Sequence, residues 1–124
     1  REGQRQVRHD YEHQVQKAIC QYLDMRKVCY FAIPNGGQRN KIVASKLKSE
    51  GVKAGVPDIC IVYDGQAYFL EVKKPKTLDS GKGSLSKNQK VMIERIKEAG
   101  GEVAVVYSVA DVIEALIDWQ INVL

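Results

Sequence analysis

The sequence predicts an α/β protein in which helices flank a mixed β-sheet. Segments with apolar residues at helical spacing alternate along the chain with short β-prone runs. An Asp64-Gly65 turn joins two of these runs and predicts an antiparallel hairpin, after which a helical segment leads to a further β-prone run. A strand–helix–strand crossover of this kind places its two strands parallel. The predicted order is therefore α-β-α-β-β-α-β-α, in a single domain that covers residues 1–124.

The first part of the chain is expected to form a helix, a strand and a shorter helix. Apolar side chains recur at helical spacing across 10–26, which predicts the first helix. The β-prone run 28–33 ends at Pro34-Asn35-Gly36-Gly37, residues that neither continue a strand nor begin a helix cleanly. Residues 41–49 are predicted to form a short basic helix that ends at Gly51.

The hairpin is predicted to follow a turn at 54–57. Its first strand is expected over 58–63 and its second over 66–73, because both runs are rich in β-branched and aromatic residues. Residues 74–85 contain a proline, two glycines and several lysines, which predicts an exposed, mobile loop.

The last part of the chain is expected to form helix, strand and helix. Residues 86–99 have helical spacing, and Ser86 and Gln89 form a capping-box pattern at the start. The apolar run 103–107 predicts a buried strand, and a final helix is expected over 108–119. The apolar stripe of that final helix either belongs to the core or contacts a partner chain.

Composition excludes several classes of protein. Of the 124 residues 44% are hydrophobic, yet no apolar run approaches the roughly 18 residues that a membrane-spanning helix needs. The polar first residues do not resemble a signal peptide. The three cysteines are too widely spaced to indicate a zinc site or a disulfide framework, and Cys29 and Cys60 are expected to be small core residues. We expect a protein of a reducing compartment that does not contact a membrane.

Basic residues are concentrated in the middle of the chain. The net charge is +4, but between residues 35 and 90 eleven basic residues stand against five acidic ones. Such a basic region indicates either a surface that binds a polyanion or an ordinary solubilising surface, and charge alone does not separate these alternatives.

Two carboxylates and an ammonium group are expected to converge at one end of the hairpin. Side chains alternate along a strand, so Glu71 and Lys73 share one face, and the turn brings Asp58 close to them. Paired carboxylates are costly unless a cation neutralises them, and their oxygens suit Mg²⁺ or Mn²⁺. Lys73 would then orient a water or stabilise negative charge on a phosphate. The alternative is an exposed Glu71–Lys73 pair with Asp58 as a turn residue.

Two polar residues on helices are predicted to face the same site. On a helical wheel Glu12 falls between Ile19 and Leu23, inside the apolar arc of the first helix. Gln89 aligns with the apolar positions of the third predicted helix, so it either points at the sheet or only caps the helix.

These residues resemble a known family. Gly55-Val56-Pro57-Asp58 followed by Glu71-Val72-Lys73 is similar to the PD-(D/E)xK nuclease pattern on a restriction-endonuclease-like fold. Together with a helix that carries Glu12, an Asn35-Gly36-Gly37 loop and a later helix with Gln89, the sequence resembles the virus-type replication-repair nuclease (VRR-NUC) domain.

The resemblance extends from about residue 10 to residue 116 and implies metal-dependent hydrolysis of phosphodiester bonds with Mg²⁺ or Mn²⁺. The roles that it implies are Asp58 and Glu71 as metal ligands, Val72 as a ligand through its backbone carbonyl, Glu12 as a ligand directly or through water, Lys73 as the catalytic lysine and Gln89 as a residue that organises the catalytic site.

DNA is the partner that the resemblance implies. The residues expected to contact its phosphates are Asn35, Gly36, Gly37, Arg39, Lys74, Lys76 and Lys87, with Lys82 and Lys90 nearby. No interleaved aromatic platform for single strands is present, so duplex or branched DNA is favoured.

The function predicted from the sequence is therefore a Mg²⁺- or Mn²⁺-dependent endonuclease. It would act on branched DNA in the manner of a Holliday-junction resolvase, as a homodimer in the cytoplasm of a bacterial or phage-infected cell. The alternatives are a nuclease that trims flap or linear DNA in a larger repair machine, and a non-catalytic DNA-binding module on the same fold.

Overall fold

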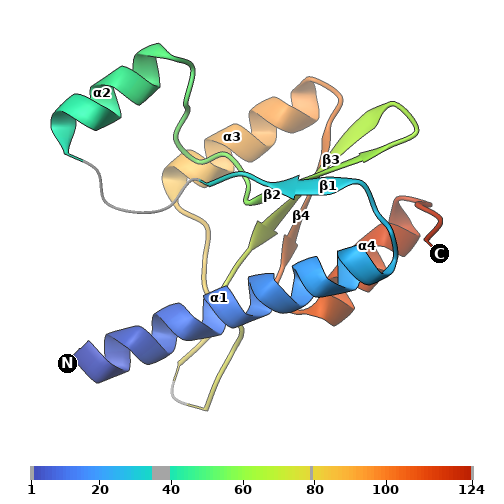
Figure 1. The fold of residues 1–124 in the computed structure, drawn as a ribbon, viewed down its shortest axis with the longest axis horizontal. Coiled ribbons are helices and arrows are strands. Elements are labelled where there is room, and N and C mark those ends of the chain that lie inside the picture. The colour runs from blue at the N-terminus through green and yellow to red at the C-terminus, as the bar shows by residue number, and fades with distance from the viewer. Residues whose placement is uncertain (1, 35–39, 79, 124) are drawn as a thin grey trace.

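The computed structural model describes residues 2–34, 40–78 and 80–123 (Figure 1). Within them the elements follow the predicted order. Their bounds are α1 Glu2–Met25, β1 Tyr30–Ala32, α2 Lys41–Ser49, β2 Ile59–Tyr63, β3 Gln66–Val72, α3 Lys87–Glu98, β4 Glu102–Val106 and α4 Val109–Asp118. No helix of these residues is both long and apolar enough to cross a membrane.

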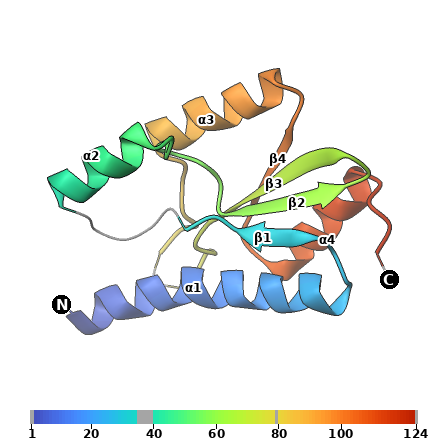
Figure 2. The ribbon, with the colours of Figure 1, turned by 45° about the horizontal axis from the view of Figure 1, so that its top comes forward.

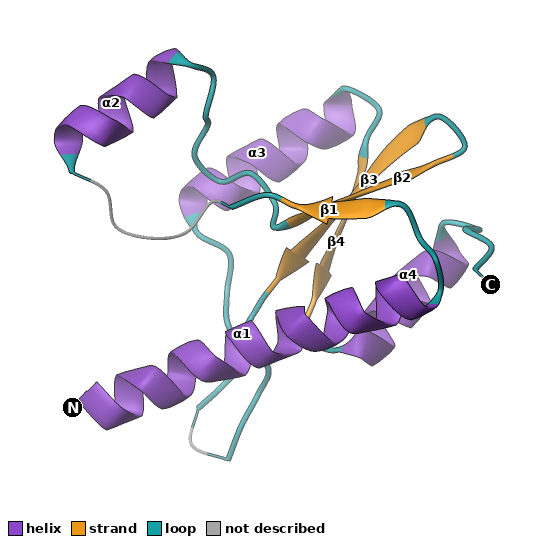
Figure 3. Ribbon diagram, viewed as in Figure 1, coloured by secondary structure: helices purple, strands orange, loops and turns teal. Residues whose placement is uncertain are grey.

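The four strands form a mixed sheet in the order β1-β2-β3-β4. Strands β1 and β2, and likewise β2 and β3, pair antiparallel, whereas β3 and β4 pair parallel through the crossover helix α3. Helix α3 lies on one side of the sheet, and α1 and α4 lie together on the other (Figures 2 and 3). The predicted α/β architecture, a mixed sheet with helices on both faces, is confirmed.

The hairpin turn is the tight two-residue type that Asp-Gly favours. Asp64 and Gly65 both have positive φ, +48° and +78°, and Tyr63 pairs directly with Gln66. This turn fixes the register, in which Ile59 lies opposite Leu70. The register therefore places the start of β2 beside the end of β3.

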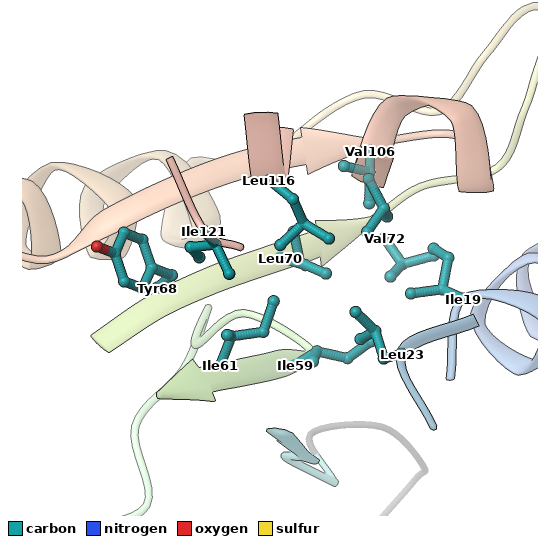
Figure 4. Packing of buried hydrophobic residues seen from close by; sticks show 11 residues of the cluster. Ile19, Leu23, Ile59, Ile61, Tyr68, Leu70, Val72, Val106, Leu116 and Ile121 are labelled. Carbon is teal, nitrogen blue, oxygen red and sulfur yellow. The ribbon is translucent and has the colours of Figure 1, made fainter. Parts of the chain in front are cut away.

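The hydrophobic core lies between the sheet and the helices α1 and α4 (Figure 4). Leu70 and Val72 of β3 are fully buried there, against Ile19 and Leu23 of α1. Because side chains alternate along a strand, burying Leu70 and Val72 on this face turns the intervening Glu71 toward the face that α3 covers. Core packing thus sets the direction in which Glu71 points.

The helix α1 is longer than the periodic pattern predicts. It begins at Glu2 rather than near residue 10. The added residues include glutamate, glutamine and arginine, which have high helix propensity but do not form an apolar stripe. Hydrophobic periodicity therefore does not detect this extension.

Two expectations about apolar residues have different outcomes. Cys60 is buried as expected, but Cys29 is exposed and precedes β1, which is one of the two edge strands of the sheet among the described residues. Trp119 packs against the core, with its ring centroid 5.0 Å from that of Tyr68, so the core alternative holds for this residue.

Part of the segment 74–85 is exposed, as its composition predicts, and the segment also has internal hydrogen bonds. Gly83 N donates to the carbonyl of Lys74 at 2.8 Å, and Thr77 N donates to the carbonyl of Ser80 at 2.9 Å. These bonds fold the segment back on itself, even though Leu78 at its tip is fully exposed. Sequence composition indicates exposure but carries no information about such internal bonds.

Gly55→Ala is expected to destabilise the fold more than other substitutions at glycines with positive φ. Gly55 has φ +80°, and a Cβ there would lie 2.3 Å from the carbonyl oxygen of Asn88 in α3. Gly51 has φ +100° but nothing within 4 Å, so Gly51→Ala measures the cost of backbone strain alone. We expect about 1–2 kcal/mol for Gly51→Ala and on the order of 2 kcal/mol more for Gly55→Ala, measured by urea unfolding. Equal losses would contradict the close approach of this loop to α3.

Candidate active site

Asp58 and Glu71 are brought together by the pairing of β2 with β3. Asp58 N donates to the carbonyl of Leu70 at 3.1 Å, which continues the ladder one residue beyond β2. The Asp58 carboxylate oxygen Oδ2 in turn accepts a hydrogen bond from Val72 N at 2.8 Å. Asp58 is therefore bound to the backbone on both sides of Glu71. The two carboxylates therefore lie close together, as the sequence predicts.

Glu71 is buried, with 2% of its surface exposed. Its Oε2 accepts a hydrogen bond from Gln89 Nε2 at 3.3 Å, whereas its Oε1 is buried without a hydrogen-bond partner among the described residues. An unsatisfied buried polar atom costs on the order of 1–3 kcal/mol. The alternative of an exposed Glu71–Lys73 pair at a strand end is excluded.

The pKa of the Glu71 carboxyl is raised from 4.5 to about 8, and burial is the largest cause. A hydrogen bond that protonated Glu71 can donate to Asp58, together with the negative charges of Asp58 and Glu12, contributes to this rise, whereas the ammonium of Lys73 opposes it. Without a cation, the site therefore holds a protonated or strongly destabilised carboxyl group at neutral pH.

Gln89 both caps α3 and contacts the site. Its side-chain oxygen accepts from Ser86 N at 2.9 Å, and Gln89 N donates to Ser86 Oγ at 3.2 Å, which completes the capping box. Its amide nitrogen remains free for Glu71. Both alternatives drawn from the sequence are therefore realised: the amide oxygen caps the helix and the amide nitrogen donates to Glu71.

Glu12 is exposed, so the prediction that it faces the core is wrong. Among the residues of α1 whose burial is described, those that pack against the core begin at Val15, and toward its N-terminus the helix extends beyond the sheet (Figure 1). A helical wheel gives the direction of a side chain but does not show where the sheet ends. Glu12 is still near enough to raise the pKa of Glu71.

The oxygen atoms at the site suit a hard divalent cation. The unpaired Oε1 of Glu71 and the adjacent carboxylate of Asp58 are the ligand type that Mg²⁺ and Mn²⁺ prefer. No group of three histidine, cysteine, aspartate or glutamate side chains that could hold a metal occurs in the part of the chain that the structure describes. Ligation of a metal by Asp58, Glu71, Glu12 and the backbone carbonyl of Val72 stays a prediction.

Lys73 follows β3 directly and is half-buried. Lys73 N donates to the carbonyl of Val106 at 3.0 Å, which fixes its backbone beside the end of β4. Its charge is among the causes that shift the pKa of Glu71, so its ammonium lies within electrostatic reach of the buried carboxyl.

The residues expected to contact DNA fall into three groups: those outside the described residues, those that are exposed, and those that form contacts within the protein. Asn35, Gly36, Gly37 and Arg39 lie outside the described residues. Lys76 and Lys87 are exposed, as phosphate contacts require.

The third group, Lys74 and Lys82, forms contacts within the protein, although Lys82 is also exposed. The Lys74 ammonium donates to Ser80 Oγ at 2.5 Å and to the carbonyl of Gly81. Lys82 Nζ lies 4.8 Å from the ring centroid of Tyr107. No sequence pattern indicates that Ser80 and Gly81 contact Lys74 or that Gly83 lies beside Lys73.

Comparison with protein families gives one match. The model of the family described as the VRR-NUC domain matches residues 1–110 of the 124-residue chain. No curated protein matches the chain.

The metal-free protein is expected to lose stability as the pH rises. Glu71 has a higher pKa when folded, about 8, than the 4.5 of an unfolded chain, so the folded state binds an extra proton between these values. Its favourable contribution is complete below about pH 4.5 and is lost as the pH rises through about 8. The melting temperature in EDTA should therefore fall by several degrees between about pH 5.5 and 8.5.

Two comparisons isolate the contribution of Glu71. Glu71→Gln should remove this pH dependence, whereas Glu94→Gln, a change at an exposed position of α3, should retain it. Adding Mg²⁺ at pH 8.5 should raise the melting temperature of the parent protein but not of Glu71→Gln. A parent protein as stable at pH 8.5 as at 5.5 in EDTA would contradict the burial of an ionisable Glu71.

Proposed function

The chain belongs to the VRR-NUC family and is a nuclease domain of the PD-(D/E)xK type, and we propose that it is a Mg²⁺- or Mn²⁺-dependent endonuclease. The proposed substrate is branched DNA such as a four-way junction, cut by a homodimer. The proposed setting is the cytoplasm of a bacterial or phage-infected cell.

One observation carries the proposal that the domain is catalytic. Glu71 is buried beside Asp58 with one carboxylate oxygen unpaired, and Lys73 follows on the same strand face. A module that only bound DNA would gain nothing from acidic groups placed near phosphates, because they repel the backbone. Such an arrangement is understandable where a cation neutralises the acids.

The residues that would hold the cation are Asp58, Glu71 and the backbone carbonyl of Val72, with Glu12 directly or through water. A divalent cation at such a site lowers the pKa of a water and polarises a phosphate oxygen. Gln89 holds Glu71 by donating to Oε2, so that Oε1 stays directed to the site.

Lys73 supplies the positive charge that belongs to the protein itself. In phosphodiester hydrolysis a water oxygen bonds to phosphorus while the bond to one sugar oxygen breaks, and negative charge grows on the phosphate. The ammonium of Lys73 would donate a hydrogen bond to this group or orient the attacking water. Lys76 and Lys87 would hold the DNA backbone without reading bases.

The preference for branched DNA and the homodimer follow from what the family resemblance implies. Two alternatives are kept: a nuclease that trims flap or linear DNA in a larger machine, and a binding module without catalysis. The buried carboxylate pair favours catalysis over binding alone, and substrate choice distinguishes the two nuclease proposals.

The first test is cleavage of labelled DNA with Mg²⁺. We expect the protein to cut a four-way junction faster than a flap or a linear duplex. Lys73→Ala should lose activity by a factor of about 10² to 10³. Lys97→Ala, at the opposite end of α3 from Gln89, is the matched control and should retain activity. Cleavage of no substrate, or full activity of Lys73→Ala, would refute the enzyme proposal.

The second test concerns assembly. Because a four-way junction presents two equivalent strands to be cut, we expect a dimer with twofold symmetry. Light scattering should give a mass near twice the 13.9 kDa of one chain. A mass near one chain across the micromolar range would contradict the homodimer and would favour a domain that works within a larger machine.

A further inference from the structure

The segment between Lys74 and Gly83 is closed by bonds at both its base and its middle. Gly83 N donates to the carbonyl of Lys74 at 2.8 Å, which joins the two ends. The Lys74 ammonium donates to Ser80 Oγ at 2.5 Å and to the carbonyl of Gly81. The Lys74 side chain thus binds the returning half of the loop, and we call this closed segment the braced loop.

The braced loop brings Gly83 against Lys73. A Cβ at Gly83 would lie 3.5 Å from Cδ and 3.6 Å from Cβ of Lys73, and 3.2 Å from Lys74 N. A side chain added at Gly83 would therefore lie at van der Waals distance from the aliphatic part of Lys73. At Gly81, by contrast, nothing lies within 4 Å of a Cβ. Close contact with Lys73 distinguishes Gly83 from the other glycine of this loop.

A lysine side chain needs such a constraint to act at one point. It has four flexible methylene groups, and fixing it costs up to about 2 kcal/mol of rotamer entropy. The backbone of Lys73 is fixed by its bond to Val106, but that bond does not restrict the side chain. Gly83 lies on one flank of it, and Glu71 precedes it by two residues on the same strand face.

We propose that Lys74 and Gly83 are positioning residues for Lys73, with the braced loop acting as a wall that directs the Lys73 ammonium toward the carboxylates. Its consequence for activity rests on the proposed nuclease function, in which Lys73 is the catalytic lysine. The assignment replaces the sequence-based expectation that Lys74 contacts DNA phosphate, since its ammonium is already bonded within the loop.

A positioning role and a phosphate-contact role predict different kinetics. A residue that positions the catalytic lysine affects kcat, because an error of about 1 Å in placement can cost 10²-fold in rate. A phosphate contact affects KM for DNA and the salt dependence of binding, with little effect on kcat. The two roles of Lys74 are therefore separable by measurement.

The first experiment changes Gly83, the residue of the braced loop that lies beside Lys73. Gly83→Val should lower kcat by about 100-fold, with KM for DNA within about twofold of the parent, and Gly83→Ala should lower kcat much less because its Cβ would meet Lys73 only at ordinary van der Waals distance. Gly81→Ala is the matched control and should keep the parent kcat, because it retains the carbonyl that Lys74 contacts and fills open space. Equal kcat values for Gly83→Val and the parent would overturn the proposal.

The second experiment changes Lys74, whose ammonium closes the braced loop. Lys74→Met should lower kcat with little change in KM, and Lys74→Arg, which keeps the donor, should recover a substantial part of that loss. Lys76→Met, an exposed lysine of the same loop, should instead raise KM. If Lys74→Met raised KM and reduced the salt dependence as Lys76→Met does, Lys74 would be a phosphate contact and the proposal would fail.

A third measurement does not depend on nuclease activity. The rate at which an amine-acylating reagent modifies Lys73 in the metal-free protein reports how closely its side chain is held. We expect a several-fold faster reaction in Gly83→Val and Lys74→Met than in the parent or in Gly81→Ala, at temperatures where all are folded. Unchanged rates would refute the positioning role even in an active enzyme. A parent protein that cuts no DNA but shows the faster rates would refute only the proposed function.

Discussion

The buried carboxyl group of Glu71 is the constraint on which the rest of the site depends. Its side chain is 2% exposed, and one of its oxygens is unpaired. Burial of an acid with an unpaired oxygen is unfavourable, so the free energy of the site depends on the groups that surround Glu71. Gln89 donates to one oxygen, Lys73 offsets part of the charge, and Asp58 adds a second acid, whose repulsion is relieved by a proton or by a bound cation. Burying these acids therefore lowers the stability of the metal-free fold at the position where a cation would bind.

The position of this group follows from packing on the opposite face of the sheet. Leu70 and Val72 are fully buried against α1, and the pleat then turns Glu71 toward α3. Helix α3 begins at the same end of the sheet, where Gly55 lets the loop before Asp58 approach its first turn closely. The hydrophobic core and the catalytic geometry are therefore specified together, because a slip of one residue in β3 would exchange their faces.

The sequence predicts the element order and the hairpin site well, since both depend on local patterns. Alternation in β3 and an Asp-Gly turn are sufficient to place Asp58 near Glu71. The prediction for Glu12 fails, because a helical wheel turns this residue inward whereas its side chain is exposed in the folded protein. Contacts between residues without a common pattern are not predictable either. The bond from Lys74 to Ser80 and the closeness of Gly83 to Lys73 arise only after the loop has folded back.

The lysines also show why charge counted along a sequence overstates the surface available to DNA. The segment after β3 carries lysines at 74, 76 and 82, and all three add equally to the basic middle of the chain. In the folded protein the ammonium of Lys74 is bonded within the loop, whereas Lys76 and Lys82 are exposed and Lys82 also lies over the ring of Tyr107. Charges that organise a loop are held in place by short contacts, whereas charges that hold a polyanion must remain in solvent. Basic composition near an active site therefore reflects two distinct requirements, and only the three-dimensional contacts separate them.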